Sequence, residues 1–84
     1  MTYKALFTRS FLREYKKLPQ GVRERVEEAI LEVVKRPYSG TKLRGELTGY
    51  YRWRVGDYRI IYMIDEKGKC VIFIDVGIRR AIYD

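Results

Sequence analysis

The chain has 84 residues, enough for one small domain and too few for two separate hydrophobic cores. Its hydrophobic fraction of 46% is that of a globular protein, which excludes a mainly disordered chain. The 18 Lys and Arg residues outnumber the 11 Asp and Glu residues, and the formal charge of +7 favours an anionic partner: nucleic acid, an anionic membrane surface or an acidic protein segment.

Two residue types restrict the chemistry further. The chain has no histidine, which excludes Ser-His-Asp and Cys-His catalysis and argues against a zinc site. Cys70 is the only cysteine and lies in an apolar run, so we expect a buried structural thiol in a reducing environment. No apolar stretch approaches the roughly 18 residues of a membrane-spanning helix, and no signal-peptide pattern opens the chain. We therefore expect a cytoplasmic protein with no metal and no cofactor.

The first half of the chain predicts a strand and two helices. Residues 3–8 (YKALFT) resemble a short strand, and apolar residues then follow helical spacing, with Thr8 or Ser10 able to cap the helix. Pro19 interrupts this pattern and suits an early position in a second helix, whose apolar stripe continues to about Lys35. That helix is expected to end there, because a residue that precedes proline disfavours the α conformation.

The second half predicts a loop and three strands. Residues 37–49 contain three glycines and are expected to form the loop. The predicted strands cover residues 50–55, 57–65 and 70–76. Gly56-Asp57 is a tight-hairpin signal, and Gly77 is expected to mark the end of the last strand. The order β-α-α-β-β-β predicts one α+β domain over residues 1–84, with a helical hairpin packed on a mostly antiparallel four-stranded sheet.

Strand alternation divides the hairpin YYRWRVGDYRIIY into an inner face, toward the helices, and an outer face. The predicted inner face carries Tyr51, Trp53, Val55, Tyr58, Ile60 and Tyr62. The predicted outer face carries Arg52, Arg54 and Arg59. With a tight turn, Arg59 lies near Arg54 or Arg52 across the ladder, and this face forms the floor of an open groove.

The outer arginines predict an anion site. Neighbouring arginines repel one another, so folding alone does not require them, whereas guanidinium groups beside aromatic rings suit phosphates and bases. Residues 35–59 hold seven basic residues against two acidic ones, too few to neutralise the group. For a single arginine the alternative stays open that Arg52 or Arg54 only solvates the outer face or pairs with Glu46 or Asp57.

Three segments resemble the RelE/ParE superfamily of type II toxins: KLRG at 42–45, the hairpin at 50–62 and VGIRRAIY at 76–83. The opening YKALFTRSFLREYKKLP also resembles the start of that superfamily, so the resemblance covers nearly the whole chain. It implies a RelE-like fold and, for the RelE branch, a ribosome-dependent endoribonuclease that cleaves mRNA in the ribosomal A site and inhibits translation. The expected partners are the ribosome with its mRNA and a cognate antitoxin.

The resemblance also implies roles for particular residues. The catalytic set would be Arg52, Arg54, Arg59, Arg79 and Tyr83. The resemblance makes Arg44 a contributor to RNA binding. Lys42 and Arg80 complete the expected RNA-binding set because their positions let them reach the edges of the groove. This chain departs from the family pattern in having Ile78 where many members have histidine, and arginines where lysines often act. Arginine stays protonated, with a pKa above roughly 12, so it is a poor general base, and Tyr83 is the best side chain for proton transfer.

Two other functions stay open on the sequence. One is a ParE-like toxin that inhibits DNA gyrase by binding, without a nuclease site. The other is a basic RNA-binding module whose catalytic activity has decayed. The retained arginines and tyrosine favour the nuclease, because a toxin that only binds has no need of them, while the replacement of lysine by arginine keeps both alternatives open.

Overall fold

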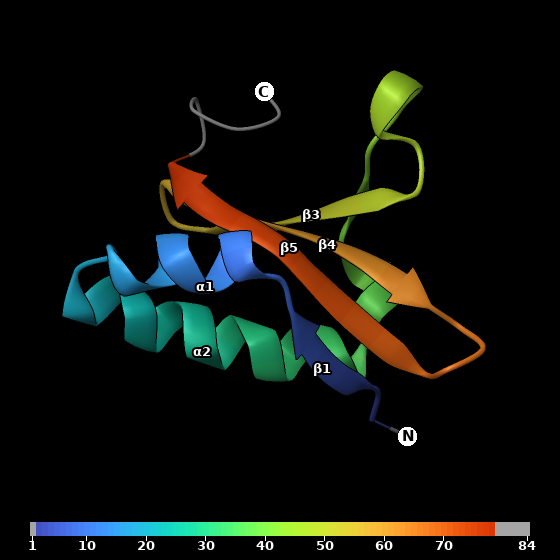
Figure 1. Cartoon of the computed structure of the whole chain (residues 1–84), viewed down its shortest axis with the longest axis horizontal. Coiled ribbons are helices and arrows are strands. Elements are labelled where there is room, and N and C mark those ends of the chain that lie inside the picture. Colours follow the sequence, from blue (N-terminus) through green and yellow to red (C-terminus); the bar gives the residue numbers. More distant parts are fainter. Residues whose placement is uncertain (1, 79–84) are drawn as a thin grey trace.

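A computed structural model describes residues 2–78, in which two α-helices lie on one face of a five-stranded sheet (Figure 1). The helices are α1 (Arg9–Lys16) and α2 (Gln20–Lys35). The strands are β1 (Lys4–Phe7), β2 (Thr41–Lys42), β3 (Tyr50–Val55), β4 (Tyr58–Asp65) and β5 (Cys70–Ile78). Two short 3-10 turns, η1 (Pro37–Ser39) and η2 (Gly45–Leu47), flank β2. None of the helices in residues 2–78 has the length and apolar character that crossing a membrane requires.

The sheet confirms the predicted α+β class and corrects its strand count. Its order is β1-β5-β4-β3-β2, with β1 parallel to β5 and every other pair antiparallel. The fifth strand is β2, which pairs with β3 inside the segment predicted as a loop. A strand of two residues is too short to show alternation, so the sequence pattern could not predict it.

Local signals explain where the helices begin. The Thr8 hydroxyl accepts a hydrogen bond from the Phe11 N–H at 3.1 Å and so caps α1. The same hydroxyl donates to the carbonyl of Ile74 at 2.7 Å, which ties the start of the helix to β5. The sequence left the choice between Thr8 and Ser10 open, and Thr8 is the cap. Pro19 is the N-cap of α2, one position before the helix rather than inside it.

The core lies between the helices and the inner face of the sheet. A chain of aromatic rings crosses it, with centroid separations of 5.8 Å for Phe11–Phe73, 6.0 Å for Phe73–Tyr62 and 5.5 Å for Tyr62–Tyr51. These separations fall in the range at which aromatic pairs attract one another. Tyr62 is fully buried and Trp53 packs against the core, so the predicted inner face is confirmed.

Two predictions about β5 are wrong. Gly77 does not end the strand, since it lies opposite Arg59 and the ladder continues to Ile78 opposite Tyr58. Cys70 is partly exposed rather than buried, because it lies opposite Asp65 on the outer face, where its thiol donates to the carbonyl of Gly68 at 3.3 Å.

Candidate functional site

The turn between β3 and β4 sets the geometry of the arginine face. Val55 lies opposite Tyr58, so the turn consists of Gly56 and Asp57 alone. Gly56 has a φ of +60°, and a left-handed glycine at the first of two turn positions is the pattern of a type II′ hairpin. The turn lies beside the end of β5 (Figure 1). The predicted tight register is confirmed.

This register brings the outer-face residues into two rows across the sheet. The first row consists of Gly77, Arg59 and Arg54, on β5, β4 and β3. The second row consists of Asp75, Ile61, Arg52 and Thr41, on β5, β4, β3 and β2. Arg54 therefore lies directly opposite Arg59, and Arg52 lies on the same face one row away. Like charges in directly opposed positions destabilise a ladder, so the hairpin holds this pair against an electrostatic cost.

The three arginines lie at different depths. Arg54 is exposed, Arg52 is partly buried and Arg59 has an exposed fraction of 0%. The expectation that all three form the floor of an open groove is wrong for Arg59, which lies on the central strand beside Ile61, also 0% exposed. A buried guanidinium keeps its proton, and its field is screened less than that of a surface charge.

Within residues 2–78, no acidic side chain forms a salt bridge with Arg52 or Arg54. Pairing with Glu46 or Asp57, the alternative that the sequence left open, is therefore not found there. The Nε of Arg52 is buried, and no residue of the described chain accepts a hydrogen bond from it. A buried donor without an acceptor is rare in proteins. The rest of the Arg52 side chain is partly exposed, so a phosphate oxygen at this face contacts the guanidinium there and meets the Nε only after the side chain moves.

The edge strand β2 adds a residue that the sequence did not indicate. Directly opposed residues share a face, and Thr41 lies opposite Arg52 whereas Lys42 lies opposite Tyr51. Thr41 therefore extends the Arg52 row, and Lys42 has the parity of the inner face. Lys42 and Arg44 are both exposed at this edge, and their contact with RNA stays a prediction. Arg79, Arg80 and Tyr83 lie outside the described residues, so their roles stay predictions too.

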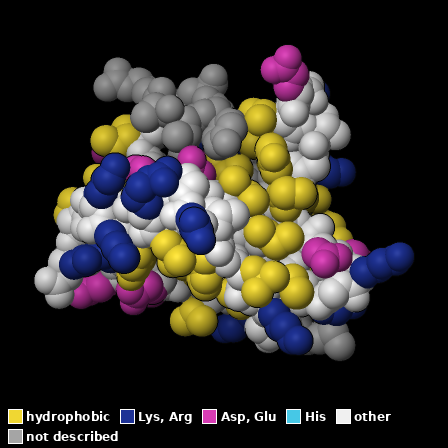
Figure 2. Space-filling model, viewed as in Figure 1, with side chains coloured by type: hydrophobic (Ala, Val, Ile, Leu, Met, Phe, Trp, Pro, Cys, Tyr) yellow, Lys and Arg dark blue, Asp and Glu magenta, His cyan; other side chains and the backbone are white. Residues whose placement is uncertain are grey.

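A second group of basic residues covers helix α1. Figure 2 shows Lys and Arg side chains gathered over this helix, where Arg9, Arg13, Lys16 and Lys17 are all exposed. Arg13 and Lys17 form salt bridges with Glu14, at 3.4 Å and 3.3 Å. Glu14 thus partly neutralises the charge over α1, whereas no salt bridge to Arg52 or Arg54 is found in residues 2–78.

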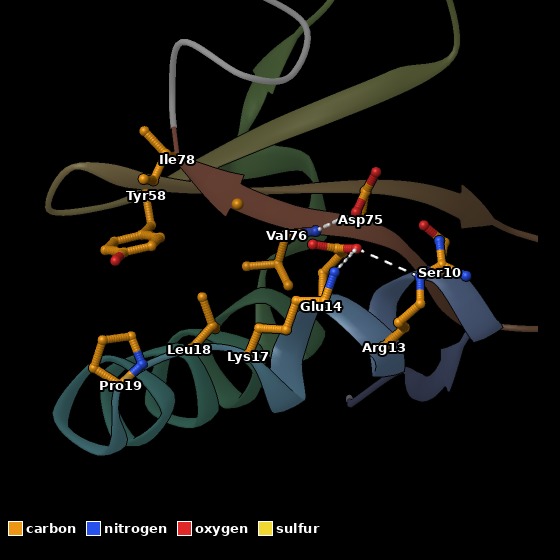
Figure 3. A pocket seen from close by; sticks show the side chains of 11 residues that line it. Ser10, Arg13, Glu14, Lys17, Leu18, Pro19, Tyr58, Asp75, Val76 and Ile78 are labelled. Carbon is orange, nitrogen blue, oxygen red and sulfur yellow. Dashed lines mark hydrogen bonds and ion pairs between the residues drawn. The ribbon is translucent and has the colours of Figure 1, made fainter.

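A cavity of about 510 Å³ lies between α1 and the end of β5 (Figure 3). Glu14 and its two basic partners form one wall, and Tyr58 and Leu18 form an apolar wall. None of its lining residues belongs to the predicted site, but Gly77 in its wall belongs to the Arg59 row. In residues 2–78 no cluster of three or more Cys, Asp or Glu side chains is placed to hold a metal ion.

A family model described as the ParE toxin of the type II toxin-antitoxin system parDE matches residues 5–83. The chain belongs to this toxin family. It is 35% identical over 85 residues to Toxin RelG of Mycobacterium tuberculosis, covering 99% of this chain and 98% of that protein. It is 33% identical over 82 residues to the mRNA interferase toxin RelE of Escherichia coli, covering 95% of this chain and 86% of that protein.

Solved structures of RelE-type toxins share the fold. A chain of the RelBE2 toxin-antitoxin complex of Mycobacterium tuberculosis superposes with a TM-score of 0.89 at 32% identity, covering 94% of this chain and 93% of that one. The resemblance inferred from the sequence is confirmed, and this protein is a RelE-family toxin of a toxin-antitoxin system.

Proposed function

We propose that this RelE-family toxin is a ribosome-dependent endoribonuclease that cleaves mRNA in the ribosomal A site and thereby inhibits translation. One observation carries the proposal: the outer face holds Arg54 opposite Arg59, next to Arg52 with its buried Nε lacking an acceptor in residues 2–78. Opposed positive charges do not favour folding, whereas the negative charge of an RNA phosphate at this face would be attracted by these arginines. The named activity of the E. coli relative supports the same reaction.

The reaction is an attack of an RNA 2′-hydroxyl on the adjacent phosphate. A bond forms between the 2′-oxygen and phosphorus, the bond from phosphorus to the 5′-oxygen of the next nucleotide breaks, and a 2′,3′-cyclic phosphate results. One proton leaves the 2′-hydroxyl and one reaches the departing 5′-oxygen. The intermediate phosphorane carries more negative charge than the substrate, so fixed positive groups accelerate the step.

Each arginine has a role that follows from its depth. Arg52 and Arg54 are accessible and hold the phosphate oxygens through charge-assisted hydrogen bonds. Arg59, buried in this structure, acts on the same phosphate through its field. We assign Arg79 to the same catalytic set and Tyr83 to proton transfer, since arginine cannot serve as a base. Contacts with the RNA backbone are assigned to the exposed Lys42 and Arg44, together with Arg80.

The ribosome and an antitoxin complete the proposed system. The ribosome presents the A-site codon in a fixed geometry, and orienting an in-line attack accounts for a large part of a rate enhancement. Cytoplasmic translation complexes are thus the site of action. A toxin that halts translation needs a neutralising partner, and the structure of the M. tuberculosis RelBE2 neighbour is that of a toxin-antitoxin complex. We propose that a short antitoxin binds this chain in the same way.

The main rival is inhibition of DNA gyrase by binding, since the matching family model is described by ParE.

One experiment distinguishes the two functions. The purified toxin is added to ribosomes programmed with a defined codon in the A site, and the message is mapped by primer extension. We expect cuts inside the A-site codon and loss of most cleavage in Arg79→Ala. Intact message with blocked gyrase supercoiling would establish the ParE-like function, and intact message with active gyrase would favour the decayed RNA-binding module.

A further inference from the structure

We propose that Tyr62 is a positioning residue whose buried hydroxyl fixes the RNA-binding edge of the toxin, the segment from Pro37 to Arg44, against the backbone of Arg52. The inference rests on the proposed function and adds a residue that does not touch the RNA. Tyr62 lies on the inner face of the sheet, whereas the phosphate-binding arginines lie on the outer face. Its effect on the site therefore passes through the edge strand β2.

The hydroxyl of Tyr62 makes a long-range contact that holds the η1 segment. It donates a hydrogen bond to the carbonyl of Pro37 at 2.8 Å, in a buried environment. Burial raises the pKa of Tyr62 well above its ordinary value, so the hydroxyl keeps the proton that it donates. A backbone contact from Gly40 to the same oxygen opposes part of this rise. The hydroxyl thus meets both ends of the turn that leads into β2.

The approach at Gly40 is close enough to exclude a side chain. A Cβ built on Gly40 would lie 2.1 Å from the Tyr62 hydroxyl oxygen and 3.0 Å from the Arg52 carbonyl oxygen. Gly40 has a φ of −72°, which any residue adopts, so the contact rather than the backbone conformation calls for glycine. The chain is therefore pressed between an inner-face hydroxyl and the backbone of an outer-face arginine.

The residues that follow Gly40 form the edge of the candidate site. Thr41 pairs with Arg52, and the N–H of Leu43 donates to the Tyr50 carbonyl at 3.0 Å. A two-residue strand on the sheet edge has few bonds of its own, so its place depends on what holds the chain just before it. Releasing the Tyr62 hydroxyl frees this edge and its exposed Lys42 and Arg44, while the arginines on β3 and β4 stay in the ladder.

A Tyr62→Phe variant of the full chain tests the role, because it removes the hydroxyl and keeps the ring. On programmed ribosomes we expect the KM to rise about fivefold to tenfold, because this factor corresponds to the free energy of one buried hydrogen bond. The kcat should stay nearly unchanged. Amide hydrogen exchange in residues 37–44 should become faster, and exchange in the hairpin should stay at the wild-type rate. Tyr15→Phe removes a hydroxyl that bonds Glu27 between the helices and should change neither quantity.

Gly40→Ala gives an independent check. The added methyl collides with the Tyr62 hydroxyl and should raise the KM more than Tyr62→Phe does. Combining the two changes should recover part of the loss, because the nearest colliding atom is gone while the neighbouring contacts at 3.0 Å remain. A double variant no better than Gly40→Ala alone would overturn the proposal.

The outcomes separate this inference from the proposed function. Wild-type toxin that leaves the message intact contradicts the nuclease, and the exchange experiment then still tests the anchor. Unchanged exchange in residues 37–44 of Tyr62→Phe overturns the anchor whatever the toxin cleaves. A fall in kcat at constant KM, in a variant that melts like the wild type, would also overturn it.

Discussion

The two faces of the β3–β4 hairpin differ in what folding asks of them. The inner face carries apolar and aromatic side chains that complete one core with the two helices. The outer face carries Arg54 opposite Arg59, a pair of like charges whose mutual repulsion weakens the ladder. Residues that a fold needs and residues that a fold only tolerates thus alternate along the same strands. The second set points to the function.

The inner face should control stability and influence cleavage only through folding. Ile60 is 0% exposed, so Ile60→Ala should lower the free energy of unfolding by about 2–5 kcal/mol through lost burial and a cavity. That is a large share of the stability of a domain of this size. Urea unfolding measures the loss. A decrease below about 1 kcal/mol would be too small for the truncation of a buried side chain and would show that this face is not the core.

The outer face should show the opposite behaviour at Arg54. Arg54→Gln removes one of two directly opposed positive charges, so the free energy of unfolding should stay constant or rise by a few tenths of a kcal/mol, roughly. Cleavage on programmed ribosomes should fall about tenfold, because one charge-assisted contact with phosphate is lost. Arg9→Gln removes the same charge from helix α1 and is the matched control. A clear loss of stability in Arg54→Gln would contradict the contrast between the faces.

A smaller effect concerns the exposed end of the sheet, away from the arginines. Glu66 accepts hydrogen bonds from Lys69, Tyr38 and Tyr3, and these bonds lower its pKa from 4.5 to about 2. Because the folded pKa lies below the ordinary value, this contribution to stability is present above pH 4.5 and is lost as the pH falls toward 2. Glu66→Gln should flatten the dependence of the urea midpoint on pH in that window. An unchanged dependence would show that the bonds to Glu66 add nothing to stability.

At alkaline pH, the stability of the fold depends on the protonation of Tyr38. The bond to Glu66 raises the pKa of Tyr38 from 10.0 to about 12. Here the folded pKa lies above the ordinary value, so the contribution is present below pH 10.0 and is lost as the pH rises toward 12. Tyr38→Phe should weaken the alkaline loss of stability, measured by the same urea midpoints. A steeper loss in the variant would contradict the assignment.

Residue spacing predicted the parts of the site that depend on local rules. The alternation of side chains along a strand assigned Tyr62 and the arginines to opposite faces. The two-residue turn that begins with a glycine placed Arg54 opposite Arg59. The depth of Arg59 was not predictable, since it depends on which strand becomes central and on what covers it. Thr41 was also missed, because a strand of two residues shows no alternation and its pairing with β3 depends on tertiary contacts.

The most direct test of the account measures cleavage and stability together in Arg52→Gln, with Arg9→Gln as control. The single-turnover cleavage rate on programmed ribosomes should fall about 10²-fold or more, because the variant lacks a preorganised donor to the reacting phosphate. The urea midpoint should not fall, because the Nε of Arg52 has no acceptor in residues 2–78. An unchanged rate, or a rate that falls only as far as the folded fraction falls, would contradict the claim that the outer arginines perform the reaction.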